Sequence, residues 1–248
     1  MPRNPKARQR SLQRHAAKRK QKRQALAASH PSGARSMLRA AASWPLDECL
    51  VTQDWQKHPD ELVQILVARR SPEGTVAAAT ILVDLACLGV KNAMGSLLTP
   101  QEYRELREGM ASTQRLMPAD LDLVAKIARE GIAYARQLGF HPHRDYQDAA
   151  VLLAGADPDA CDLDVPLGVD GKPLFVAGPY DDAPRIVAQL TRAVGPDGFD
   201  FVVPVDEDEL LTLLEDELEE EPDWDSVRPP PSPGPAWLDW WRRWRSKG

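Results

Sequence analysis

The two ends of this 248-residue chain are too highly charged to build a hydrophobic core, so a fold must lie between them. Residues 1 to 28 contain ten Lys and Arg and no acidic residue. Residues 206 to 225 contain twelve Asp and Glu and no basic residue, and a Pro-rich spacer, "RPPPSPGP", follows them. We therefore expect one core domain, residues 44–205, between a basic N-terminal arm and hinge (1–43) and a charged C-terminal extension (206–248).

The middle of the chain predicts an α+β fold with antiparallel β-hairpins and packed helices. "LVQILVARR" and "TVAAATILVDLAC" flank the turn "SPEG" and predict a hairpin, with a helix over the alanine-rich second segment as the alternative. "PLDECLVTQDW" has a strand-like mixture of residues. The hinge is expected at "SHPSGARS", because Pro31 and Gly33 both break regular structure.

Two later segments predict helices that end at glycine. Between residues 119 and 138, apolar side chains recur at steps of three and four; Gly139 suits the left-handed position after the helix, and Phe140 follows where a Schellman motif places an apolar contact. "APRIVAQLTRAVG" has the same character and stops at Gly195. The pair Asp170-Gly171 predicts a second hairpin with strands on both sides, and "GFDFVVPV" predicts a strand that closes the core.

The segment "GFHPHRDY" raises the question of a metal site. His141, His143 and Asp145 stand at alternate positions, and imidazole and carboxylate groups are zinc ligands. The stretch also fits a helix start, because Pro142 suits a first turn and Asp145 there is favoured by the helix dipole. A second helix is the simpler interpretation; a metal site that adds a distant acid such as Asp84 is the alternative.

Three cysteines lie far apart, with no CxxC pair: Cys49, Cys87 and Cys161. They predict reduced thiols rather than a disulfide framework or a zinc knuckle. Cys87 would need a neighbouring base or cation to become a nucleophile, and the sequence places neither His141 nor Lys91 beside it. A buried structural thiol is the expectation. No Gly-rich phosphate loop, GxSxG elbow or Walker lysine occurs, and no cofactor is expected.

The basic arm is the strongest signal for a partner. Lys and Arg that contact phosphates release counterions, which makes binding depend on salt and hardly on sequence. We expect nucleic acid or a ribonucleoprotein as the partner, with a solubilising tail as the alternative, and the arm could also pair with the acidic segment. The arm's basic residues are Arg3, Lys6, Arg8, Arg10, Arg14, Lys18, Arg19, Lys20, Lys22 and Arg23.

The residues after the proline spacer form a second candidate binding segment. Trp237, Trp241 and Trp244 fall at i, i+4 and i+7, so they can share one helix face, with Trp240 and several Arg interleaved. This aromatic surface predicts burial in the groove of a protein partner, on bases or at a membrane surface. Docking on the protein's own core is the alternative, which the stiff spacer disfavours.

The sequence predicts a soluble cytoplasmic protein without a transmembrane segment. The N-terminus lacks the apolar run of a signal peptide, and "TVAAATILVDLACLGV" is interrupted by Asp84 and too short to span a bilayer comfortably. An organellar transit peptide is the alternative for the arginine-rich N-terminus.

"LACLGVKNA", "LGFHPHRDY" and "GKPLFVAGPY" together resemble segments of an uncharacterised bacterial protein family, which has CLGVK, GFxPHxDF and GKPL-type motifs. The resemblance covers roughly residues 44 to 203. It implies a single α+β domain and carries over no catalytic residue. The residues themselves predict a non-enzymatic function, binding nucleic acid or a ribonucleoprotein through the arm. A metal-dependent hydrolase centred on His141, His143 and Asp145 is the alternative.

Overall fold

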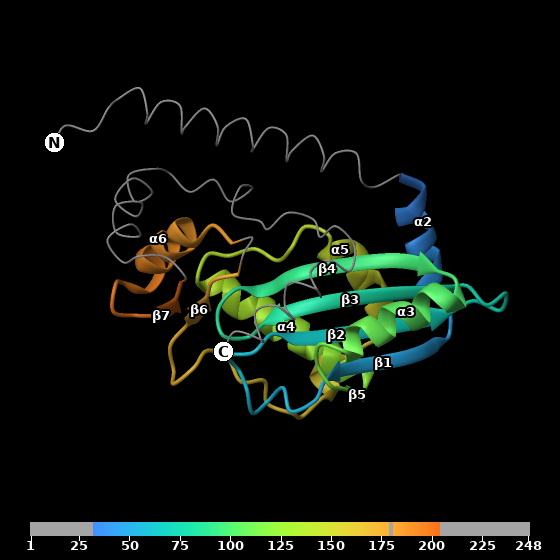
Figure 1. Ribbon diagram of the computed structural model, residues 1–248, viewed down its shortest axis with the longest axis horizontal. Helices are drawn as coiled ribbons and strands as arrows, with labels where there is room; N and C mark the ends of the chain where they lie inside the picture. Colours follow the sequence, from blue (N-terminus) through green and yellow to red (C-terminus); the bar gives the residue numbers. More distant parts are fainter. Residues whose placement is uncertain (1–31, 179–180, 204–248) are drawn as a thin grey trace, which may run out of the picture.

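A five-stranded antiparallel sheet is the centre of the fold (Figure 1). It is seen in a computed structural model, which describes residues 32–178 and 181–203. The strand order is β4-β3-β2-β1-β5, so consecutive hairpins make up most of the sheet. The bounds are β1 (Leu46–Thr52), β2 (Val63–Arg70), β3 (Val76–Asp84), β4 (Gly89–Leu98) and β5 (Leu116–Pro118).

Helices cover both faces of this sheet, so the chain has the expected α+β architecture. Helices α4, α5 and α2 pack behind the sheet and α3 crosses its front in Figure 1. A smaller sheet of two parallel strands lies with α6 at one end of the molecule. No helix within the described ranges is long and apolar enough to cross a membrane. The remaining bounds are α2 (Ser32–Ala41), α3 (Pro100–Ala111), α4 (Leu121–Gln137), α5 (Tyr146–Ala149), α6 (Ala183–Val194), β6 (Leu174–Val176), β7 (Asp200–Val202) and the 3₁₀ turns η1 (Ala150–Leu153) and η2 (Pro158–Ala160).

The hairpin β2–β3 confirms the sequence prediction for residues 62 to 87. Its register runs from Val63 opposite Val83 to Arg70 opposite Val76, and Gly74 adopts φ +92° in the turn. The helical alternative for the alanine-rich segment is wrong. Both faces of these central strands are buried, which explains why their sequences are almost continuously apolar.

Alternate residues of each strand enter two separate apolar clusters, as the two-residue period of a strand requires. On the α4 side, Ile65 and Ile81 pack against Ile127. On the opposite side, Leu66 and Leu82 belong to the cluster that includes Tyr103 and Met110 of α3: Leu50, Leu66, Ala68, Val76, Ala78, Leu82, Tyr103 and Met110.

Helix α4 ends as its sequence predicts. Gly139 has φ +85°, its N–H donates to the carbonyl of Arg136 (3.0 Å), and the N–H of Phe140 donates to the carbonyl of Ala135 (2.8 Å). These two bonds make a Schellman motif, and Phe140 is buried beside the helix. Helix α6 likewise stops at Gly195, with φ +81°.

The region expected to be a hinge is partly helical. Gly33 lies inside α2, and Leu38 and Ala41 of this helix are buried in the core. A glycine lowers the stability of a helix, but tertiary packing of the other helix residues can compensate for this loss. The packed part of the chain therefore begins before residue 44.

Two other expectations need correction. The helix expected after residue 144 is only the single turn α5 followed by η1. At Asp170-Gly171 the turn forms, with φ +50° and +81°, but only an isolated bridge from Val169 to Lys172 flanks it. The strand that follows, β6, pairs in parallel with β7 instead, so the expected hairpin with two strands is wrong.

Candidate functional site

The turn between β3 and β4 brings buried polar groups together at one end of the sheet. Asp84, the last residue of β3, accepts a hydrogen bond from the Cys87 backbone N–H at 2.9 Å through Oδ1. The turn is itself covered, because its Leu85 carbonyl accepts from the Gly168 N–H and its Ala86 carbonyl accepts from the Leu174 N–H. Asp84 and Cys87 are therefore both buried.

A β-bulge aims Lys91 at this turn. Leu82 pairs with Asn92 and Val83 with Val90, so Lys91 is the extra residue on β4. Its Nζ donates to Oδ2 of Asp181 at 2.7 Å, and the two side chains are only 11% and 5% exposed. The backbone N–H of Gly178 donates to the same oxygen at 2.7 Å. The segment before α6 is thus joined to the sheet by a buried ion pair.

The electrostatics of this cluster keep Lys91 and Cys87 in unreactive protonation states. Burial would lower the pKa of Lys91, but Asp181 and Asp84 outweigh it and raise that pKa above its usual value. Burial, with a smaller contribution from Asp84, raises the pKa of the Cys87 thiol well above its ordinary value. Burial also raises the pKa of Asp84, while Lys91 and the turn N–H groups act in the opposite direction. At neutral pH Lys91 is an ammonium and Cys87 a thiol, and neither form is a nucleophile.

The cluster Asp84–Lys91–Asp181 therefore acts as a polar clamp between the β3–β4 turn and α6. It brings together two groups that the sequence singled out, Asp84 and Lys91, and surrounds Lys91 with charge that also reaches Cys87. Sequence reasoning missed Asp181. No local pattern marks a carboxylate that pairs with a lysine ninety residues earlier, since the bulge that re-aims Lys91 is a tertiary feature.

The "HPHRD" segment, in which the sequence offered a metal site as the alternative to a helix start, runs beside β4. The backbone N–H of His143 donates to the Val90 carbonyl at 2.8 Å, and the imidazole is buried. Its Nδ1 accepts from the backbone N–H of Asp145 at 3.3 Å, so that nitrogen faces its own turn. His141 is exposed. Across residues 32–178 and 181–203, no group of three or more His, Cys, Asp or Glu side chains is placed to hold a metal ion.

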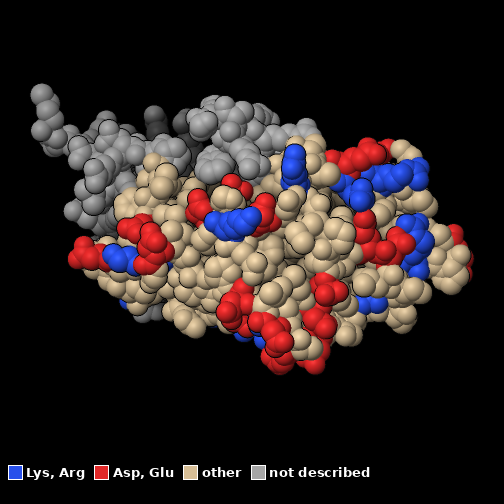
Figure 2. All heavy atoms as spheres, turned by 90° about the horizontal axis from the view of Figure 1, so that it is seen from below, with Lys and Arg blue, Asp and Glu red and all other residues tan. Residues whose placement is uncertain are grey.

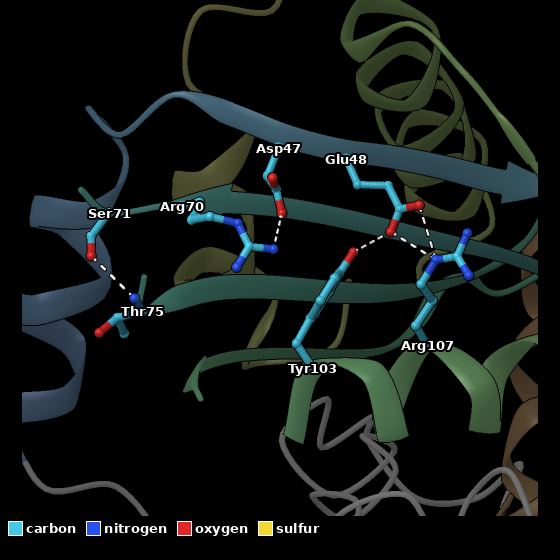
Figure 3. Close-up of polar contacts among 7 residues, drawn as sticks. All are labelled: Asp47, Glu48, Arg70, Ser71, Thr75, Tyr103 and Arg107. Carbon is cyan, nitrogen blue, oxygen red and sulfur yellow. Dashed lines mark hydrogen bonds and ion pairs between the residues drawn. The ribbon is translucent and has the colours of Figure 1, made fainter. Parts of the chain in front are cut away.

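A second polar cluster ties α3 to β1 on the front of the sheet (Figure 3). The Tyr103 hydroxyl donates to Oε2 of Glu48, and Nε of Arg107 lies 2.9 Å from both Glu48 oxygens. Arg70 pairs with Asp47 at 2.6 Å beside them. Burial and Glu48 together raise the pKa of Tyr103, so its hydroxyl is a donor at all physiological pH values. This cluster orients α3 on the sheet.

The remaining candidate residues lie outside the described ranges. They are the ten basic residues of the arm, from Arg3 to Arg23, and the four tryptophans Trp237, Trp240, Trp241 and Trp244. The described core carries charges of both signs. Figure 2, seen from the side on which β1 and β5 lie, shows Lys and Arg side chains separated among Asp and Glu.

The structure places Asp84 and Lys91 in one cluster, whereas His141 is exposed and His143 is buried. Comparison with known proteins finds no matching family model, no matching curated protein and no matching solved structure.

Proposed function

We propose that this protein binds nucleic acid or a ribonucleoprotein through its basic N-terminal arm, with the α+β core as the body that carries the arm. The observation behind this proposal is the separation of charge along the chain. The arm, residues 1–28, holds ten positive charges and no negative one. The described part of the core holds 16 Lys and Arg against 24 Asp and Glu.

This separation restricts where a polyanion can bind. The acidic core repels phosphate, and several of its cations already pair with carboxylates: Arg35 with Asp148, Arg70 with Asp47, Arg107 with Glu48 and Arg129 with Asp159. The arm contains no Asp or Glu that could pair with its Lys and Arg side chains. Phosphate contacts would therefore come from the arm, with strong dependence on salt and little on base sequence.

The structure gives no support to the alternative of a metal-dependent hydrolase. Within the described residues, Nδ1 of His143 is turned toward the backbone of Asp145, and His141 is exposed. The buried amine and thiol near the β3–β4 turn are held in their protonated forms. The clamp Asp84–Lys91–Asp181 is explained by its role in joining α6 to the sheet.

The test compares the full chain with two variants, one lacking residues 1–28 and one in which the ten basic arm residues are Gln. Binding to a fluorescent 20-nucleotide RNA and to a 20-base-pair DNA is measured between 50 and 200 mM salt. Since six to ten phosphate contacts make affinity fall by ~10³–10⁵ over this range, we expect that steep loss for the full chain. Both variants should bind weakly at every salt concentration while the core unfolds as before.

The Gln variant is the matched control, because it keeps the length of the arm and removes only its charge. Equal binding by either variant and the full chain at 50 mM salt would show that the arm is not the binding element. A preference of the full chain for RNA or for DNA would identify the partner class within the proposal.

A further inference from the structure

The two edges of the five-stranded sheet differ in how they are protected against pairing with another strand (Figure 1). The β5 edge has three residues and ends at Pro118, which has no N–H to offer. The β4 edge has ten residues. At its start the Val90 carbonyl accepts from the His143 N–H, and the bulge at Lys91 follows. Its second half, residues 94–98, contains no charged residue and no proline, and all five residues are partly exposed. We call residues 94–98 the open edge.

The hydrogen-bond pattern of β3 shows which backbone groups of the open edge face outward. The Arg70 N–H donates to the Pro45 carbonyl at 3.1 Å, so Arg70 turns its backbone groups away from its β3 partner, Val76. Val76 therefore turns its N–H and C=O to β4, and Ala78, two residues later, does the same. Ala78 lies opposite Ser96. The backbone of Ser96 thus bonds to β3.

Gly95 and Leu97, on either side of Ser96, consequently turn their N–H and C=O groups away from the sheet. No residue in the described ranges bonds to these outward groups. The face of the sheet behind them is covered, because a Cβ added at Gly95 would lie 2.9 Å from Cδ1 of Leu38 in α2. The unpaired feature is therefore the edge of the strand and not a face of the sheet.

We propose that the open edge pairs with the open edge of a second copy of this chain, which joins the two sheets into one continuous antiparallel sheet. The two-fold axis passes at Ser96, so this residue faces Ser96 of the other copy. Gly95 of each copy then lies opposite Leu97 of the other. Each of these two pairs exchanges both of its outward N–H···O=C bonds.

The open edge is complementary to itself in this register. On the α3 side, Met94 lies opposite Leu98 of the other copy, which makes an apolar cross-strand pair. On the opposite side, Leu97 faces Gly95 of the other copy, whose missing side chain leaves room for the leucine. No like charges meet across the axis, because residues 94–98 contain no charged residue.

The surroundings of the open edge favour two copies and no more. Two charged side chains beside it are already paired, Lys91 with Asp181 at 2.7 Å and Asp148 with Arg35 at 2.6 Å, so they bring little unbalanced charge to a neighbouring copy. The other edge of the sheet is short and ends at Pro118. Pairing through β4 alone gives a closed dimer and not a growing fibre.

Disulfide formation in the full chain tests the register. Ser96→Cys is made in a Cys161→Ser background, so that the native cysteines left, Cys49 and Cys87, are both buried. In the proposed dimer the two Cα atoms at position 96 lie ~4.5 Å apart, which a disulfide can bridge. The matched control is Met117→Cys on β5, where the native side chain is 41% exposed. Under a mild oxidant, disulfide-linked dimers of the Ser96→Cys protein should form roughly five times faster or more, because pairing raises the local concentration of the second thiol. Equal rates for the two variants would overturn the proposal.

Two measurements without engineered cysteines complete the test. In sedimentation of the full chain, the average mass should rise from monomer toward dimer between about 10 and about 500 µM, since a small interface forms a weak dimer. Ser96→Lys places two ammonium groups opposite each other and should weaken the dimer by about tenfold, whereas Met117→Lys should not. Amide exchange of Gly95 and Leu97 should slow as concentration rises, while that of Ser96, already bonded to β3, should stay constant. A mass that remains monomeric throughout, a dimer that Ser96→Lys leaves unchanged, or equal responses of these three amides would each overturn the proposal.

Discussion

Nζ of Lys91 lies 2.7 Å from Oδ2 of Asp181, and this buried pair connects β4 to the segment that leads into α6. Apolar contacts join the same two parts of the fold as the ion pair does. The third hydrophobic cluster packs Cys87 and Leu88 of the β3–β4 turn against Phe175 of β6 and Leu190 of α6. Loss of the ion pair would therefore weaken the attachment of β6 and α6 to the five-stranded sheet.

We expect Asp181→Asn to lower the free energy of unfolding by about 3 kcal/mol, because it leaves a buried ammonium without its main counter-charge. The double replacement Lys91→Met with Asp181→Leu should cost less than this single change, since no buried charge of the pair remains. Urea unfolding measures both. The control is Asp159→Asn, which removes an exposed partner of Arg129 and should cost below about 1 kcal/mol. Equal costs for the two Asp→Asn variants would refute a structural role for the clamp.

Local sequence patterns predict those elements whose turn, periodicity and end residues all lie within about twenty residues of one another. The hairpin β2–β3 and the helix α4, with its Gly139–Phe140 end, are examples. Helix α3 was missed although its start carries a capping box, in which Thr99 and Glu102 bond to each other and Pro100 takes the first position. That signal was readable in the sequence. A capping box thus indicates a helix start even where apolar periodicity is weak.

Other features could not be read from local patterns. The parallel pairing of β6 with β7 joins segments on either side of α6, and Asp170-Gly171 fixes only the turn, not its partners. Likewise the bulge at Lys91 depends on the register of β4 against β3, which no stretch of β4 alone determines. Register and long-range charge pairing are decided by the packing of the complete sheet.

Arg69 gives a second test of buried polar structure. Its guanidinium donates to three backbone carbonyls, those of Trp44 (2.9 Å), Leu152 (2.9 Å) and Ala154 (2.5 Å). An ammonium cannot reach three acceptors in this planar arrangement, so Arg69→Lys should lower the free energy of unfolding by about 2 kcal/mol. The matched change at the next residue, Arg70→Lys, affects a partly exposed pair and should cost below about 1 kcal/mol. Thermal unfolding of the two variants measures the difference. An equal loss of stability in both would contradict the conclusion that the three hydrogen bonds of Arg69 stabilise the fold.

The close approach of α4 to the sheet depends on Gly131. An added Cβ there would lie 2.8 Å from Cγ1 of Val83 and 3.3 Å from Cδ2 of Leu85. At an exposed helix position Gly→Ala would stabilise by about 1 kcal/mol, but here we expect a net loss of about 1–3 kcal/mol. Combining Gly131→Ala with Val83→Ala removes the clashing methyl group, so the two changes together should cost less than their sum. A double-mutant cycle by urea unfolding measures this coupling, and a stabilised Gly131→Ala variant would contradict it.

Stability should fall as pH rises above about 9, and Cys49 provides a specific test. Burial, with smaller contributions from Asp120 and Glu48, raises the pKa of this thiol to about 12. Between its ordinary pKa of about 9 and this value, the unfolded chain loses the proton and the folded chain keeps it, so each pH unit favours unfolding by up to about 1.4 kcal/mol. Tyr134, whose pKa burial raises to about 12, adds to the same decline.

The Cys49→Ala variant separates packing from ionisation at this position. At pH 7 it should be less stable than the parent, because the alanine leaves space in the apolar cluster that the Cys49 sulfur fills. At pH 11 the difference should shrink or reverse, since the parent now bears the cost of keeping a buried thiol protonated while the unfolded chain releases the proton. Urea unfolding at pH 7, 9, 10 and 11 follows this difference directly. A constant gap between the two proteins over this range would show that the folded and unfolded states hold the Cys49 proton equally, contrary to the burial of its side chain.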